Sequence, residues 1–152
     1  MRMSGDRIVT PTERLAQLER SENPALIAKL PSGFAVMGDS QFLPGYCLLL
    51  AYPQVGKLND LQGAQRTQFL EDMARLGDAV LGSTDAIRIN YSIYGNLDPF
   101  LHAHLFPRYA WEEPEHATIP PMSIPGEVRS NLDHAFNSER HAELMLAIRH
   151  RL

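Results

Sequence analysis

The chain has 152 residues, of which 44% are hydrophobic and 21% charged, a composition typical of a folded globular protein rather than a disordered one. Its net charge is −4 and it has no run of five like charges, so we expect no long nucleic-acid partner, although a small nucleotide is compatible with this charge. The one cysteine, Cys47, excludes an intrachain disulfide, and no apolar run reaches the roughly 18 residues of a membrane span, so we expect no membrane partner and a cytoplasmic location.

The first predicted helix begins at a capping motif. Thr10 is a preferred N-cap residue, Pro11 fits the first helical position and Glu13 stands three residues after the cap, so a short helix is expected to about residue 21. The apolar spacing predicts the remaining elements in chain order: strands at 34–37 and 46–51, a long amphipathic helix at 58–81, strands at 86–91 and 101–108, and a C-terminal helix from about 127 or 131 to 148.

This order of elements favours an α+β fold, because strands and helices do not alternate as they do in parallel sheets. We expect an antiparallel β-sheet with the long helix and the terminal helices packed on one side. The length is that of a single domain over residues 1–152, with a core at about 30–110 and a C-terminal extension at about 111–152.

Two histidines lie in the last predicted strand, in the sequence LHAHLFPR at 101–108. Side chains of a strand alternate between its two faces, so His102 and His104 are expected to share one face while Ala103 and Leu105 point into the core. A neutral imidazole can act near pH 7 as a nucleophile, a general base or a metal ligand. The pair is therefore the first candidate for a functional site, although two histidines on a strand are also compatible with a purely structural role.

The histidine strand resembles the signature of the histidine triad superfamily, in which three histidines are separated by single hydrophobic residues and often followed by Pro-Arg. His102 and His104 match the first two positions, and Phe106 occupies the third. The resemblance covers about residues 30–110, through FAVM at 34–37, LPGYCLL at 43–49, the long helix and IRIN at 87–90. It implies the superfamily's fold and a homodimer in which two sheets join.

In that superfamily the middle histidine attacks the α-phosphorus of a nucleotide and forms a nucleotidyl-histidine, so the resemblance implies that His104 is the nucleophile and that His102 orients the site. The other candidates would bind the substrate. By the same analogy they are Asn90 and the loop of Gly95 and Asn96 at the phosphate, Asp39 at the ribose hydroxyls, and Arg108 at the phosphate, with a surface ion pair as the alternative for Arg108.

Two departures from the pattern predict a weakened activity. The turn Pro-Gly is commonly followed by histidine in the superfamily, and here Tyr46 follows it. A phenol, with an ordinary pKa of about 10, is a poor proton donor to a leaving group. Phe106 removes a further polar partner near the bound phosphate.

The resemblance implies a nucleotide hydrolase or nucleotidyl transferase, similar to a diadenosine polyphosphate hydrolase, that acts on a nucleoside phosphate, phosphoramidate or dinucleoside polyphosphate. It implies no required cofactor, and a divalent cation is compatible with the nucleotide. One alternative is a nucleotide-binding protein of the same fold with little or no turnover. The other is a metal protein in which His116 and Glu113 join the histidine pair, but their spacing matches no recognised closed metal site, so no metal site is predicted.

Overall fold

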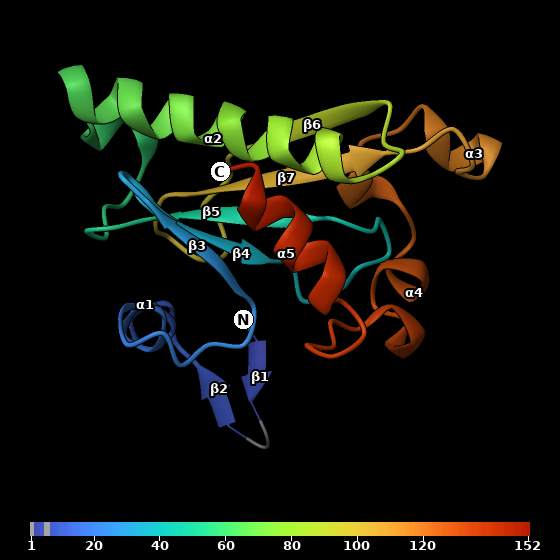
Figure 1. Cartoon of the computed structure of the whole chain (residues 1–152), viewed down its shortest axis with the longest axis horizontal. Coiled ribbons are helices and arrows are strands. Elements are labelled where there is room, and N and C mark those ends of the chain that lie inside the picture. The colour runs from blue at the N-terminus through green and yellow to red at the C-terminus, as the bar shows by residue number, and fades with distance from the viewer. Residues whose placement is uncertain (1, 5–6) are drawn as a thin grey trace.

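A five-stranded antiparallel sheet forms the centre of the computed structural model, which describes residues 2–4 and 7–152 (Figure 1). The strand order is β3-β4-β5-β7-β6, and a separate hairpin of β1 and β2 precedes it. The strands are β1 Arg2–Ser4, β2 Arg7–Val9, β3 Leu26–Leu30, β4 Gly33–Met37, β5 Cys47–Ala51, β6 Arg88–Ser92 and β7 His102–Arg108. The helices are α1 Pro11–Glu19, α2 Gly63–Ser83, α3 Pro114–Ala117, α4 Gly126–Arg129 and α5 Ala142–His150.

One strand of the main sheet was not predicted. β3 pairs with β4 at the edge of the sheet, and its register shifts between Leu26 and Ala28. Only Ile27 and Leu30 of this strand are buried, so its five residues lack the regular alternation by which a half-buried strand is recognised. The other four strands lie within two residues of their predicted bounds, and the predicted antiparallel α+β fold is confirmed.

α2 and α5 cover one face of the sheet (Figure 1). α2 directs Phe69, Leu76 and Val80 onto that face, and α5 adds Met145 and Ile148. α2 was predicted to begin at residue 58, but residues 58–60 form a single 3₁₀ turn and the helix begins at Gly63. In the part of the chain that the structure describes, no helix is long and apolar enough to cross a membrane.

α1 packs on the opposite face, which corrects the expectation that all helices lie on one side. Leu15 and Leu18 of α1 are buried against Phe34, Val36 and Leu50 of the sheet. The predicted capping box is present: the Thr10 hydroxyl accepts from the Glu13 N–H at 3.1 Å, and the Glu13 carboxylate accepts from the Thr10 N–H at 2.9 Å. The cap fixes where α1 begins, and the apolar pair on its surface decides which face it covers.

The C-terminal helix is shorter than predicted. α4 is a single turn, and α5 begins only at Ala142, after a loop in which the Asn137 side chain accepts from the N–H groups of Glu139 and Arg140. Before this loop the chain is tied to the segment that follows β4, because the Gln41 N–H donates to the His134 carbonyl and the Phe136 N–H donates to the Asp39 carbonyl. These bonds draw the C-terminal segment across the end of the sheet.

The packing of α5 can be tested by a substitution at Ile148. Its side chain is fully buried, so Ile148→Ala should lower the free energy of unfolding by about 2–4 kcal/mol through lost burial and a cavity. Leu146→Ala is the matched control, because Leu146 lies on the same helix with 46% of its surface exposed and should cost less than about 1 kcal/mol. Urea unfolding measures both changes, and equal losses would contradict the packing described here.

Candidate active site

β7 presents the two histidines on one face of the sheet, as the alternation predicts. His102 lies opposite Leu50 of β5 and His104 lies opposite Leu48. The intervening Ala103 and Leu105 are completely buried in the core beneath α2. Because β7 is hydrogen-bonded to β5 on one side and β6 on the other, the backbone holds both imidazoles in a fixed relation.

The histidines line a cavity of about 260 Å³ on the face that α1 partly covers. Segments distant in the sequence form its walls. α1 contributes Arg14, the segment after β4 contributes Asp39, and α4 contributes Arg129. This arrangement makes the cavity a concave site with several convergent polar groups, which is the usual form of a small-ligand site.

The His102 ring is held in one tautomer by a backbone carbonyl. Its Nδ1 lies 2.8 Å from the carbonyl oxygen of Phe100, which can only accept, so Nδ1 carries the proton and donates it. The ring also stacks on the Phe100 ring, with centroids 4.5 Å apart. In the neutral imidazole the lone pair is therefore on Nε2, the nitrogen that a nucleophilic or ligating role requires.

His104 is held in the opposite tautomer by Tyr46. The Tyr46 hydroxyl lies 2.7 Å from Nδ1 of His104. Because its proton has no other acceptor among the described residues, we assign the hydroxyl as the donor and Nδ1 as the acceptor. The proton of the neutral ring is then on Nε2. The two rings meet edge to face with centroids 4.9 Å apart, so one imidazole offers a lone pair beside the other's N–H donor.

Burial keeps His104 uncharged. Loss of solvent and, to a smaller extent, the neighbouring His102 together lower the pKa of His104 to about 4. Burial also raises the pKa of Tyr46, and the negative charge of Asp39 adds to this effect. At neutral pH the pair is therefore a neutral phenol that donates to a neutral imidazole.

The position of Tyr46 depends on two neighbours. The Tyr46 ring stacks on Phe106 with centroids 4.3 Å apart. The Tyr46 ring also packs against Gly38, where an added Cβ would collide with it. Tyr46 and Phe106 therefore form one packed aromatic unit that supports His104.

Asn90 and Arg108 line a different hollow, along β6 and the segment 117–121. Arg108 is buried, and its guanidinium donates to the carboxylate of Glu112, to Asn90 Oδ1 and to the carbonyls of His116 and Ile119. Its donors are thus engaged by the protein. The structure places Arg108 as the anchor of the segment after β7 and does not bring it to the histidines.

The loop between β6 and β7 reaches the histidine cavity only in part. Gly95 adopts a left-handed backbone, with φ of +81°, and neither it nor Asn96 lines the cavity. Asp98 and Phe100 of the same loop do line it. Of the sequence-predicted site residues, the structure brings together His102, His104 and Asp39.

Sequence reasoning missed Arg14 and Arg129 as cavity residues. Each lies in or beside a predicted helix, and nothing in the sequence indicated that these helices cross the face that bears the histidines. Tyr46 was noted only as a departure, whereas the structure makes it the hydrogen-bond partner of His104. Its position directly after the turn Leu43-Pro44-Gly45 was the available signal.

The metal alternative is not supported by the geometry. Within the described residues no three side chains of His, Cys, Asp or Glu gather in a way that could hold a metal ion. His116 and Glu113, the proposed additional ligands, lie at the short helix α3 and do not line the cavity of the histidine pair.

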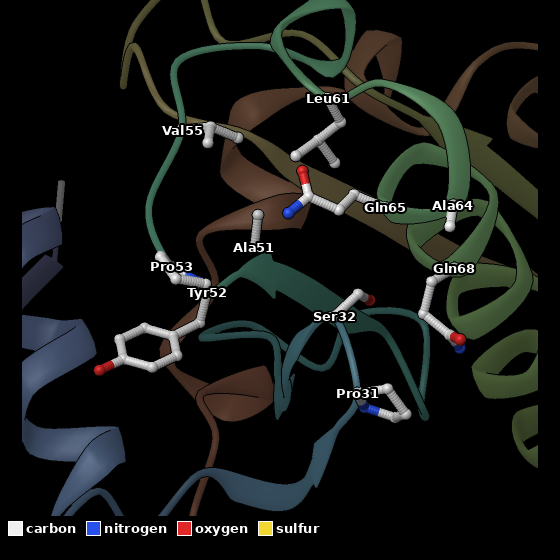
Figure 2. Close-up of a pocket in the computed structure, with 10 residues that line it drawn as sticks. All are labelled: Pro31, Ser32, Ala51, Tyr52, Pro53, Val55, Leu61, Ala64, Gln65 and Gln68. Atoms are coloured by element: carbon white, nitrogen blue, oxygen red, sulfur yellow. The ribbon is translucent and has the colours of Figure 1, made fainter.

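A second cavity, of about 340 Å³, lies between the β3–β4 turn, the end of β5 and the start of α2 (Figure 2). Two of its polar side chains, Ser32 and Gln68, are engaged in the fold. The Ser32 hydroxyl and the Gln68 amide both donate to the buried carboxylate of Asp72. Neither histidine of β7 lines this cavity, so the candidate chemistry is confined to the first one.

No protein-family model matches the chain, and no curated protein matches it. Solved structures do match. A histidine triad protein from Sinorhizobium meliloti 1021 is 17% identical with a TM-score of 0.71 over 88% of this chain and 94% of that one. A histidine triad protein from Bradyrhizobium japonicum is 23% identical, with a TM-score of 0.62 over 83% of this chain and 88% of that one. A hypothetical histidine triad nucleotide-binding protein from Sulfolobus tokodaii strain 7 is 12% identical, with a TM-score of 0.67 over 90% of this chain and 89% of that one. The chain therefore has the histidine triad fold.

The neutral state of His104 predicts a pH-dependent stability. An unfolded histidine takes up its proton near pH 6.5, whereas folded His104 does so only near pH 4. Between these pH values the unfolded chain binds more protons than the folded chain. The stabilising contribution of His104 to the free energy of unfolding is therefore complete above pH 6.5, and it falls by on the order of 3 kcal/mol as the pH drops to 4. Urea unfolding measured across this range should show the loss.

His104→Gln should remove this part of the pH dependence, because glutamine does not titrate. His150→Gln is the matched control, since His150 is exposed at the C-terminal end of α5 and should leave the dependence in place. The same slope in wild type and His104→Gln would contradict the assignment.

Proposed function

We propose that the chain is a histidine triad protein that acts as a nucleotide hydrolase or nucleotidyl transferase at the α-phosphate of a nucleotide. The observation that carries the proposal is the pair of imidazoles in the cavity, one with its lone pair on Nε2 and the other with its proton there. The fold supports it, and so does the description of the Sulfolobus tokodaii protein as nucleotide-binding.

In this proposal His102 attacks and His104 supports it, which reverses the sequence-based assignment. The Phe100 carbonyl holds the proton of His102 on Nδ1 and leaves Nε2 as the nucleophile. The hydrogen bond from Tyr46 makes Nε2–H of His104 a donor. If His102 takes the middle place of the triad, then Phe100 takes the first and His104 the third, so the missing histidine is at position 100 rather than 106.

The reaction has two steps. Nε2 of His102 forms a bond to the α-phosphorus as the bond to the leaving group breaks. The leaving group departs with the electron pair, as an anion if it is a phosphate and with a proton taken from water if it is an amine. In the second step a water oxygen bonds to phosphorus, the N–P bond breaks, and its electron pair returns to Nε2. Hydrolysis yields a nucleoside monophosphate and releases one proton from the attacking water; a different acceptor in place of water gives nucleotidyl transfer.

His104 and Tyr46 stabilise the charge that develops during attack. Nε2–H of His104 is a neutral donor for a non-bridging oxygen of the α-phosphate. A single donor of this kind contributes roughly 10²–10³ to the rate at comparable sites. Tyr46 is a positioning residue, because it acts through Nδ1 of His104.

The remaining predicted site residues keep narrower roles. Asp39 lines the cavity, and we propose that it binds the ribose hydroxyls. Arg108 donates to Asn90 Oδ1 in the hollow along β6, so the Asn90 amide stays a sequence-based phosphate contact that lies outside the histidine cavity. The backbone N–H groups of Gly95 and Asn96 stay predicted phosphate contacts. The proposal includes no resident cofactor, and a divalent cation would enter with the phosphates of the substrate.

A nucleotide-binding protein with little turnover is the second candidate. The observation that favours it is the low pKa of His104, near 4, because a neutral imidazole paired with a phenol offers no acidic proton to the leaving group at neutral pH. Good leaving groups would then be turned over and poor ones only bound.

We also propose that the whole chain acts as one domain in the cytoplasm and forms a homodimer. α1 and α5 pack on opposite faces of the same sheet, which favours one domain. No strand of the described chain pairs with the outer edge of β6, and Ile87 and Tyr91 at this edge have 69% and 42% of their surfaces exposed. An open strand edge with apolar neighbours is suited to pairing with a second copy.

The covalent step is tested by trapping. Incubation with an α-labelled dinucleoside polyphosphate or adenosine phosphoramidate, followed by an alkaline quench, should give an acid-labile, base-stable adduct on the protein. His102→Ala should abolish the adduct. His104→Ala should slow its formation about 10²-fold or more and still allow it. Peptide mapping of the labelled protein locates the modified histidine.

The opposite pattern, with adduct lost only in His104→Ala, would restore the sequence-based assignment of the nucleophile. His150→Ala is the matched control and should leave the adduct unchanged. Absence of both adduct and turnover in wild type, with micromolar binding of a mononucleotide, would establish the binding-protein alternative.

The homodimer is tested by the mass in solution. Light scattering after size-exclusion chromatography should give twice the mass of the chain for wild type, and Ile87→Glu should shift the mass towards the monomer, because a charge is costly at an apolar strand edge. Leu132→Glu is the control, since Leu132 is 85% exposed in a different segment. A monomeric wild type would contradict the dimer.

A further inference from the structure

Two arginines from opposite ends of the chain line the histidine cavity. Arg14 lies on α1, one residue before Leu15, which is buried against the sheet. Its half-buried side chain makes no hydrogen bond or ion pair within the described residues. The packing of α1 therefore holds a guanidinium at the cavity wall with its donors available.

Arg129 reaches the cavity from α4. Its Nε donates to the carbonyl of Ile124 at 2.8 Å, and Ile124 is itself buried beside Phe42 and Phe106. This bond fixes the base of the guanidinium, while its two Nη groups make no hydrogen bond within the described part of the chain. The backbone hydrogen bonds that join residues 134–136 to the segment after β4 keep α4 over the cavity.

Two acidic side chains, Asp39 and Asp98, line the same cavity. Both carboxylates take part in interactions within the protein. The charge of Arg14 is felt at the catalytic pair, because it lowers the pKa of Tyr46, against the larger effect of burial. The cavity thus holds two cationic groups with free N–H donors beside the imidazoles.

We propose that Arg14 and Arg129 form a second anion subsite, which binds the phosphate groups beyond the α-phosphate and so selects nucleotides with a polyphosphate leaving group. This rests on the proposed function, since it assumes that the α-phosphate lies at His102. Guanidinium groups bind phosphate oxygens through paired N–H donors. The subsite also compensates for the absent proton donor, because a polyphosphate with its charge neutralised leaves without protonation, whereas an amine does not.

Binding measurements test the subsite. Isothermal titration calorimetry compares AMP with the α,β-methylene analogues of ADP and ATP, in which the bond to the leaving group cannot be cleaved. Wild type should bind the analogues about tenfold more tightly than AMP or better. Arg14→Gln and Arg129→Gln should each lose more affinity for the analogues than for AMP, and the double variant should lose the preference.

Arg20→Gln is the matched control, because Arg20 follows α1 directly, is exposed and pairs with Glu22. It should keep the preference of wild type. Arg14→Lys and Arg129→Lys should retain part of it, and they replace the glutamine variants if those fail to fold. Inorganic pyrophosphate should compete with the analogues in wild type and about tenfold more weakly in the double variant.

Three results would overturn the inference. The double variant could keep the wild-type preference, or wild type could bind AMP and the analogues equally. In both cases an adduct on His102 would leave the proposed function standing. If neither AMP nor the analogues bind and no adduct forms, the proposed function fails and the subsite fails with it.

Discussion

The two faces of β7 are the constraint on which the rest of the structure depends. β7 lies between β5 and β6, so its backbone groups are engaged on both sides and its register is fixed. The buried Ala103 and Leu105 face α2, and a shift by one residue would exchange them with the histidines. The free energy of core burial therefore also fixes the direction in which His102 and His104 point.

Each imidazole has one hydrogen-bond partner within the protein, and the two different partners give the rings different roles. A carbonyl can only accept, so the Phe100 carbonyl fixes the proton of His102, while a phenol with a raised pKa donates to His104. The stack of Tyr46 on Phe106 shows that aromatic packing holds the phenol that contacts His104. Nδ1 of each imidazole is engaged within the protein, while Nε2 of each makes no hydrogen bond among the described residues.

Segments outside the central sheet shape the cavity. α1 covers part of the histidine face through Leu15 and Leu18, and the C-terminal segment is tied to the chain after β4 by backbone hydrogen bonds. Each brings an arginine to the cavity wall. The sheet thus holds the two imidazoles, and the N- and C-terminal segments decide which charged groups surround them.

The sequence by itself determined the features that depend on neighbouring residues. The capping box placed α1, the period of two placed His102 and His104 on one face, and the order of elements indicated the antiparallel α+β fold. Features that depend on contacts between distant segments were decided only by the tertiary structure. The edge strand β3 lacks regular alternation, and its place is set by pairing with β4 and by packing against α5, whose Arg149 donates to the Ile27 carbonyl. The face that α1 covers depends on Phe34 and Leu50. The proton positions on the two histidines depend on Phe100 and Tyr46, and a tautomer is set by hydrogen-bond geometry, which residue spacing alone does not contain.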